Sequence, residues 1–311
     1  MFFVSFVVEM RVLLTGATGF IGSHIARALA GEGHEIHALV HPNDDAWRIR
    51  DILPSLVTVR GDLLDSAFTV PSGSFDCCIH LAWYVEPGKY LESPQNRQWV
   101  EASVRFAHAM QDAGCRRFVA AGTCFEYTTS DEPLHESSPT VPRTLYATCK
   151  LQLFHELQKL GEKTGMEIVW PRFFYQYGPF EDPRRFVPIA INTLLRGEPF
   201  TVPPNEQVRD YLHVADVASA VCAVAHSNLT GAVNIGSGEP VAVRQIATQI
   251  AEIIGRPELI KVGTQPYAPE DSPRIVADNR RLREQTDWKH RITLNEGLRQ
   301  TIDWWKNRLP R

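Results

Sequence analysis

The sequence of 311 residues predicts an α/β protein with a doubly wound parallel sheet and a smaller C-terminal lobe. Three observations lead to this prediction. Short apolar runs alternate with helical patterns over the first two-thirds of the chain, and a glycine-rich turn follows the first apolar run. After Arg172, prolines and loops become frequent and this alternation loosens, which indicates a second lobe.

The apolar runs are expected to form six parallel strands, with helices between them where apolar residues recur at helical spacing. Because several runs are apolar on both faces, we expect helices to cover both sides of the sheet. The expected strands are 11–15, 35–40, 57–60, 77–81, 117–121 and 167–172, and the expected helices are 21–30, 98–113 and 146–164.

The two lobes are expected to interleave along the chain. Residues 10–172 form the dinucleotide-binding domain, to which 205–236 return, and 173–204 and 237–311 form the substrate-binding lobe. The apolar start MFFVSFVVEM lacks the basic region and the small-residue cleavage site of a signal peptide. Residues 1–9 are therefore interpreted as an upstream extension, with Met10 as an alternative initiator.

Composition excludes several classes of protein. The net charge of −4 argues against a general binder of nucleic acids or membrane surfaces. No apolar run approaches the roughly 20 residues that a membrane-spanning helix needs. The six cysteines show no paired metal spacing, so we expect no metal site and reduced core thiols in a cytoplasmic protein.

The glycine-rich turn GATGFIG joins the first strand to the first helix. Its glycines permit a tight turn, a close approach of backbone N–H groups to a pyrophosphate, and packing of helix on strand, while the helix N-terminus favours the anion. This arrangement predicts a Rossmann fold that binds a dinucleotide. The residues expected to contact the cofactor here are Gly16, Thr18, Gly19, Phe20, Ile21 and Gly22.

The end of the second strand bears on the choice of cofactor. An NAD site usually places an acid there for the ribose hydroxyls, but this strand is followed by no acid before Asp44. His41, Arg48 and Arg50 are candidates to face a 2′-phosphate instead, which favours NADP(H) while leaving NAD(H) possible. The arginines are equally well explained as solvated helix charges.

Tyr146 and Lys150 lie at i and i+4 on one face of an expected helix. A nearby cation favours the phenolate and lowers the tyrosine pKa towards a range useful for acid/base catalysis. The pair opens the helix after the fifth strand, and that strand runs into Gly122 and Thr123, which brings a hydroxyl to the carboxyl edge of the sheet.

Taken together, the motifs resemble the extended short-chain dehydrogenase/reductase family of sugar-nucleotide epimerases, dehydratases and reductases. The resemblance covers nearly the whole chain from Met10 and makes an enzyme the expectation. In family order the motifs are GATGFIG, GDLLD, IHLAW, GTCFEY, YATCK, RFFYQYGP, RDYLHVADVA and NIGSG.

The resemblance implies a role for each matching residue. Thr123 would hydrogen-bond the substrate oxygen, Tyr146 would act as acid/base, and Lys150 would also hold the nicotinamide ribose. Arg209 would bind the sugar-nucleotide pyrophosphate through its guanidinium. The remaining cofactor contacts implied are Asp62, Leu63, Leu81, Ala82, Trp83 and Phe173, and the remaining substrate contacts are Cys124, Phe125, Tyr175 and Arg274.

Departures from the family pattern change what is expected. The dehydratases carry acids where this chain has Cys124 and Phe125, and the only acid of that segment is Glu126, so elimination of water is not expected. Tyr175 replaces an asparagine that contacts substrate phosphate. The second pyrophosphate arginine, near residue 268, is absent, and Arg274 or the pair Arg184/Arg185 are its candidate substitutes.

The sequence therefore predicts an NAD(P)H-dependent reductase of the 4-keto group of an NDP-4-keto-6-deoxyhexose, in deoxysugar biosynthesis. The alternative is an NDP-hexose 4-epimerase that keeps NAD tightly bound, and a remote alternative is a non-catalytic dinucleotide sensor. A homodimer is expected from the resemblance, through a bundle of helices 98–113 and 146–164. Apolar outer faces would support it, although burial against the sheet gives the same pattern. The nucleotide base and the sugar configuration stay open.

Overall fold

The computed structural model describes residues 9–204, 206–265 and 272–308. Residues 1–8 of the expected N-terminal extension and the position near 268 lie outside the described residues. The chain forms two compact units that interleave along the sequence. Unit 1 comprises Met1–Gly122, Arg143–Pro171 and Val221–Ala232, and unit 2 comprises Thr123–Pro142, Arg172–Ala220 and Val233–Arg311.

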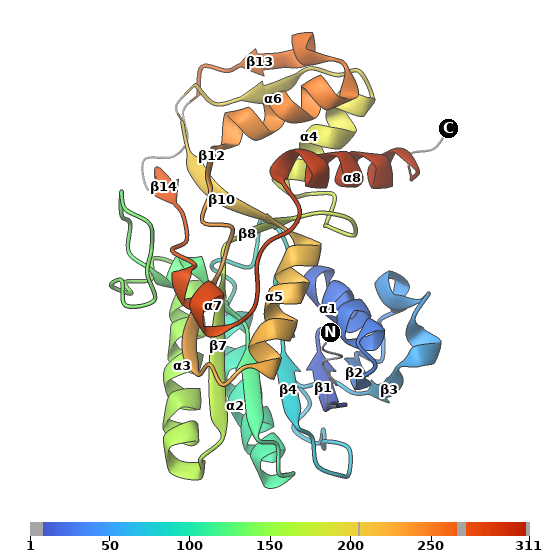
Figure 1. The fold of residues 1–311 in the computed structure, drawn as a ribbon, viewed down its shortest axis with the longest axis vertical. Helices are drawn as coiled ribbons and strands as arrows, with labels where there is room; N and C mark the ends of the chain where they lie inside the picture. The colour runs from blue at the N-terminus through green and yellow to red at the C-terminus, as the bar shows by residue number, and fades with distance from the viewer. Residues whose placement is uncertain (1–8, 205, 266–271, 309–311) are drawn as a thin grey trace, which may run out of the picture. The chain divides into compact units, whose positions relative to one another are not determined.

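The largest sheet has the strand order β11-β7-β5-β4-β1-β2-β3, with β6 (Gly122–Thr123) paired to β7 (Figure 1). The pairings of β1 with β2 and β4, of β2 with β3, and of β5 with β4 and β7 are all parallel. This is the doubly wound Rossmann-type sheet that the sequence predicts. Its other strands are β1 (Arg11–Thr15), β2 (Glu35–Val40), β3 (Val57–Arg60), β4 (Cys77–His80), β5 (Arg117–Ala120), β7 (Glu167–Phe173) and β11 (Gly231–Ile235).

The three expected helices are present as α1 (Phe20–Gly31), α2 (Gln95–Asp112) and α3 (Leu145–Thr164). Helices α2 and α3 pack side by side in unit 1 (Figure 1). Their apolar residues, such as Phe106 and Leu157, are buried within the chain itself. Their exposed positions are polar: Arg97, Glu101, Arg105 and His108 on α2, and Gln152, His155 and Lys159 on α3. The apolar pattern is thus explained by burial against the chain's own core, and the homodimer stays a prediction.

Arg117 at the start of β5 is buried, and the two terminal nitrogens of its guanidinium have partners inside unit 1. Nη1 pairs with Glu167, and Nη2 donates to the carbonyl oxygens of Val224, at 2.9 Å, and Leu229. A buried charge needs such partners, because the cost of taking it out of water is otherwise large. All six cysteines of the chain are free, buried thiols, as expected from the sequence.

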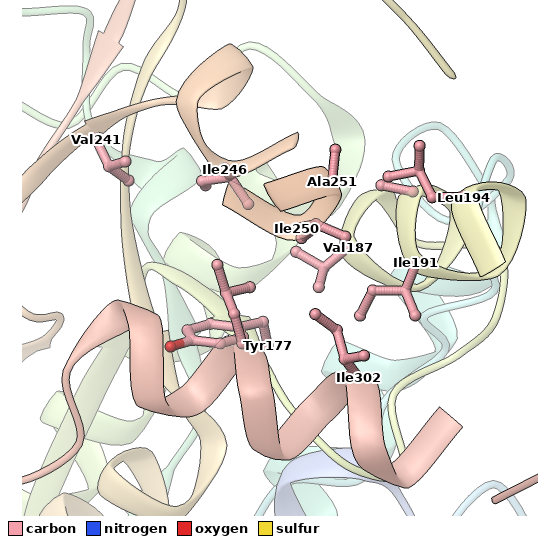
Figure 2. Close-up of a cluster of buried hydrophobic side chains, with 11 residues drawn as sticks. Tyr177, Val187, Ile191, Leu194, Val241, Ile246, Ile250, Ala251 and Ile302 are labelled. Atoms are coloured by element: carbon pink, nitrogen blue, oxygen red, sulfur yellow. The ribbon is translucent and has the colours of Figure 1, made fainter. Parts of the chain in front are cut away.

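Unit 2 has its own hydrophobic core, which three helices line with apolar side chains (Figure 2). These helices are α4 (Phe186–Leu195), α6 (Val243–Ile254) and α8 (Leu294–Lys306). Ile191 of α4, Ile250 of α6 and Ile302 of α8 are all fully buried there, beside Tyr177. Each buried side chain of this size contributes about 1.5–3 kcal/mol to folding.

A smaller sheet in unit 2 has the order β12-β10-β14, and β8 also pairs with β10. Its strands are β8 (Tyr175–Tyr177), β10 (Val208–His213), β12 (Pro240–Ala242) and β14 (Arg274–Ile275), and a separate pair is formed by β9 (Phe200–Val202) and β13 (Ile260–Val262). The remaining helices are α5 (Val214–His226) and α7 (Arg280–Gln285). Within the described residues, no helix combines the length and the apolar character that crossing a membrane requires.

Candidate active site

The glycine loop between β1 and α1 has the geometry that its sequence predicts. Gly16 has a φ of +72°, and a Cβ there would lie 2.9 Å from the backbone nitrogen of Ala82. A Cβ on Gly22 would lie 2.0 Å from the carbonyl oxygen of Gly16, so only glycine lets the helix approach the turn. Gly19 is the N-cap of α1 and leaves it without a side-chain cap. The helix N-terminus therefore keeps N–H groups for an anion, which fits the pyrophosphate of a dinucleotide.

A chain of buried hydrogen bonds fixes the backbone at Leu81 and Ala82, two of the expected cofactor residues. Both backbone N–H groups donate to Thr15 Oγ1, at 3.2 Å each, so the Thr15 hydroxyl must donate to His80 Nδ1 at 2.8 Å. His80 Nε2 then carries the proton and donates to Ser103 Oγ at 2.8 Å. The network holds His80 in one neutral tautomer and fixes the backbone of Leu81 and Ala82, which lies next to Gly16.

This network predicts a pH-dependent loss of stability. Burial, followed by the charge of Lys150, lowers the pKa of His80 from 6.5 to about 3. The folded pKa lies below the unfolded one, so the neutral ring contributes stability that is fully present above pH 6.5 and is lost as pH falls from 6.5 towards 3. We expect the unfolding free energy to fall by up to about 1.4 kcal/mol per pH unit from this group in that window. Urea unfolding across the window, compared between the wild type and His80→Gln, measures this.

The variant serves as the control for the other titrating groups of the protein. His80→Gln is expected to be less stable than the wild type at neutral pH but to lose less stability on acidification. Parallel pH dependences in the two proteins would show that His80 makes no contribution.

A turn after β2 brings Asp44 next to the glycine loop. The Asp44 N–H donates to the His41 carbonyl at 2.9 Å, and the Thr18 hydroxyl donates to Asp44 Oδ2 at 2.7 Å. Sequence reasoning discounted Asp44 because it follows the strand at a distance. The signal that reveals it is the turn sequence His41-Pro42-Asn43-Asp44.

The basic candidates of this region differ in their surroundings. Arg48 lies over the Trp47 ring, 4.4 Å from its centroid, and donates to the Thr18 carbonyl at 3.3 Å. It therefore lies against the glycine loop. Arg50 is exposed and 3.5 Å from Asp45, as expected for a solvated surface charge.

The adenine-side candidates lie in the same unit. His41 is half exposed, and its Nε2 lies 3.5 Å from Asp62 Oδ2, just beyond β3. Leu63 is buried, and its carbonyl accepts a hydrogen bond from Arg105 at 3.3 Å. Phe173, the last residue of β7, is buried as well but belongs to unit 2.

Tyr146 and Lys150 lie one turn apart at the start of α3, and both are buried. The ammonium of Lys150 lies 3.7 Å from the centroid of the Trp83 ring and 5.9 Å from that of Tyr146. Tyr90 packs edge-on against Tyr146, with ring centroids 4.9 Å apart and an interplanar angle of 82°. Removal from water strengthens the electrostatic interaction between the phenol and the ammonium.

Thr123 caps the short 3₁₀ turn Cys124–Glu126 in unit 2. Its hydroxyl oxygen accepts the Phe125 N–H at 3.3 Å, and its own N–H donates to Glu126 Oε1 at 2.8 Å. The hydroxyl proton is left to donate to a ligand, as the predicted role requires. Glu126 is fully buried, and its Oε2 accepts from Arg172 Nε at 2.7 Å. An acid held in this way is unsuited to the proton transfers of a dehydratase.

Arg209 is only 5% exposed, yet no carboxylate pairs with it within the part of the chain that the structure describes. Its Nη1 donates to the backbone carbonyls of Val208, at 3.0 Å, and Pro273, at 3.4 Å. The guanidinium carbon lies 5.6 Å from the centroid of the Tyr175 ring, which packs edge-on against Phe125. A buried guanidinium beside an aromatic wall, without an acidic partner, fits an anionic ligand with a ring attached.

The other candidate substrate residues lie in different surroundings. Cys124 belongs to the same cluster as Phe125 and Tyr175, and burial raises the pKa of its thiol. Arg274 is in register with Val208 while Arg209 is in register with Ile275, so the two arginines lie on opposite faces of the strand pair. Arg184 is exposed and paired with Asp182 at 2.8 Å.

An uncapped helix that follows the first strand of a parallel sheet suits the pyrophosphate of a dinucleotide, and a buried tyrosine–lysine pair suits acid/base chemistry. Together these features fit the class of dinucleotide-dependent enzymes. The comparison with protein families agrees with this class. The chain belongs to the NAD dependent epimerase/dehydratase family, whose model matches residues 12–236.

Two curated relatives are UDP-glucose 4-epimerases. That of Azospirillum brasilense is 29% identical, over 94% of this chain and 91% of its own, and that of Corynebacterium glutamicum is 25% identical, over 90% of each. The solved UDP-glucose 4-epimerase of Thermus thermophilus in complex with NAD is 27% identical, with a TM-score of 0.82 over 96% of this chain and 100% of that one. The chain is thus similar to NAD-dependent enzymes that act on nucleotide sugars.

Proposed function

We propose that the protein is an NDP-hexose 4-epimerase that works with a bound NAD. The observation that carries this proposal is Arg209, a buried guanidinium without an acidic partner in the described residues, which suits the pyrophosphate of a nucleotide sugar. The similarity to UDP-glucose 4-epimerases supports it and favours UDP as the nucleotide. We further propose that residues 173–204 and 237–311 supply the substrate-binding side of the enzyme.

In this proposal the reaction is a reversible oxidation at C4 of the hexose. A bound NAD would supply the hydride acceptor for C4, and its reduced form would return the hydride to the opposite face of the ring. Tyr146, as the phenolate, takes the proton of the C4 hydroxyl and gives it back when the carbonyl is reduced. Lys150 favours the phenolate through its charge, and Thr123 donates a hydrogen bond to the same oxygen.

The runner-up is a 4-ketoreductase that acts on an NDP-4-keto-6-deoxyhexose, and Arg48 is the observation that favours it. Its position on the glycine loop suits the 2′-phosphate of NADPH, a reductant that is consumed in each turnover. Asp44 argues for the epimerase, because a carboxylate at the same loop suits the ribose hydroxyls of NAD and repels a phosphate. Both functions use the same three catalytic residues.

The two functions differ in whether a reduced cofactor is consumed in each turnover. Purified protein is incubated with UDP-glucose and no added reductant, and the sugar product is followed by NMR. The proposed epimerase converts it to the C4 epimer, and denaturation releases NAD. If the protein leaves UDP-hexoses unchanged but oxidises NADPH or NADH with an NDP-4-keto-6-deoxyhexose, the reductase replaces the epimerase.

We also propose a cytoplasmic homodimer. The free, buried state of all six cysteines is compatible with a reducing compartment. The dimer rests on the family resemblance, because the exposed positions of α2 and α3 are polar.

A further inference from the structure

We propose that Asn96 is a positioning residue for catalysis, which holds Trp83 and Tyr90 against Lys150 and Tyr146. The side chain of Asn96 forms its hydrogen bonds with neither member of the catalytic pair. It lies in the first turn of α2, and its side chain reaches into the loop between β4 and α2, from which both aromatic rings come. The inference rests on the proposed function only in assigning the chemistry to Tyr146 and Lys150.

The side-chain amide of Asn96 forms three hydrogen bonds. Oδ1 accepts from the indole N–H of Trp83 at 2.8 Å, and Nδ2 donates to the backbone carbonyls of Tyr90, at 2.6 Å, and Ser93, at 2.9 Å. An indole nitrogen only donates, so the orientation of the amide is fixed by its partners. One residue with no exposed surface thus links the two aromatic residues.

Helix formation does not explain this asparagine. Asparagine is a poor helix former in the body of a helix, and the N-cap of α2 is Pro94, with no side-chain cap. A buried polar side chain costs free energy unless its hydrogen bonds are made, and those of Asn96 are made to the loop and not to its own helix. Asn96 therefore contributes by fixing the conformation of the loop between β4 and α2.

Trp83 and Tyr90 act on different members of the catalytic pair. The face of the Trp83 ring, 3.7 Å from Nζ, attracts the ammonium of Lys150 and favours its charged form. Tyr90 supports the Tyr146 ring edge-on, and the N–H of Tyr146 donates to the neighbouring Leu91 carbonyl at 2.8 Å. The loop that Asn96 shapes is thus joined to the start of α3 by its side chains and its backbone.

Loss of Asn96 is expected to release the Trp83 ring and weaken its interaction with Lys150. The charged form of Lys150 then becomes less favoured, and the phenolate of Tyr146 loses support from that cation. The pKa of Tyr146 consequently rises. Turnover that depends on the phenolate should shift to higher pH.

The test is the pH profile of kcat for Asn96→Leu, which keeps the volume and removes every hydrogen bond. We expect the limb of the profile that depends on deprotonated Tyr146 to move up by about one pH unit and kcat at neutral pH to fall roughly tenfold. Binding of UDP, whose proposed ligand Arg209 forms no hydrogen bond with Asn96, should change by less than about twofold. Asn192→Leu in α4, an asparagine in a helix of unit 2 that makes none of these contacts, is the matched control and should leave the profile unchanged.

Trp83→Phe is the second variant, in case Asn96→Leu folds poorly. It removes the indole N–H but keeps an aromatic face for Lys150, so a smaller shift in the same direction is expected. A fall in kcat with an unmoved pH profile in both variants, or no effect in either, would overturn the proposal. A folded wild type inactive on all nucleotide sugars instead rejects the proposed function. Ultraviolet titration of Tyr146, taken as the difference from Tyr146→Phe, then still measures the shift in its pKa.

Discussion

Tyr146→Phe is expected to lower kcat by about 10³-fold while leaving the binding of UDP nearly unchanged. The phenol is the group proposed to take and return the proton of the C4 hydroxyl, and removal of a general acid/base typically costs 10²–10⁴-fold. Phenylalanine keeps the ring that packs against Tyr90 in the buried start of α3, so the fold should be retained. Steady-state turnover and calorimetry with UDP measure the two quantities.

Tyr84→Phe is the matched control for the loss of a phenol. Its hydroxyl donates to Glu86 at 2.9 Å in the same loop as Tyr90, and it has no proposed chemical role. Its turnover should stay within about threefold of the wild type, the usual effect of losing one partly exposed hydrogen bond. If Tyr146→Phe kept more than a tenth of the wild-type kcat, Tyr146 would not be the acid/base, and the non-catalytic dinucleotide sensor would regain weight.

Arg209→Leu is expected to weaken the binding of UDP by about 100-fold and to leave the binding of NAD unchanged. A desolvated, charge-assisted pair between guanidinium and phosphate is worth about 2–5 kcal/mol when one partner is removed. Arg274→Leu is the comparison, because register places that arginine on the opposite face of the strand pair. Calorimetric titration with UDP and with NAD measures both affinities.

Stability distinguishes a binding role of Arg209 from a structural one. A buried charge without an acidic partner destabilises the fold, so Arg209→Leu should raise the melting temperature or leave it unchanged. A variant that binds UDP normally, or one that melts well below the wild type, would contradict the assignment. If Arg274→Leu weakened UDP binding as strongly, Arg274 would be the second pyrophosphate ligand despite its register.

The features that the sequence predicts correctly are those that residues close together in the chain determine. Strands β1, β2 and β3 begin and end where the apolar runs predict, and the glycine loop follows because Gly16 and Gly22 occupy positions where a Cβ cannot fit. That Tyr146 and Lys150 lie one turn apart on α3 follows from their spacing, while the prediction of a catalytic pair also depended on their position after the fifth strand.

The features that sequence reasoning missed depend on segments without periodicity. Asp44 reaches the glycine loop through a turn, and its hydrogen bond with Thr18 cannot be predicted from a periodic pattern. Asn96 joins a helix to a long irregular loop, so no pattern predicts its contact with Trp83. The face on which Arg274 lies is set by register with β10, which two residues of strand do not specify.

The buried guanidinium of Arg117 has a consequence for the order of events during protein synthesis. Its carbonyl acceptor at Val224 lies 107 residues further along the chain, so the ribosome releases β5 long before that partner exists. Until then, the charge must stay in water or be held by a chaperone, and unit 1 stays incomplete. A fragment that stops before Val221 should therefore be insoluble or unfolded even though it contains the glycine loop, Tyr146 and Lys150. Attempts to isolate the dinucleotide-binding half by a single cut should fail for this reason, and a split-protein design would need to supply residues 221–232 from the second piece.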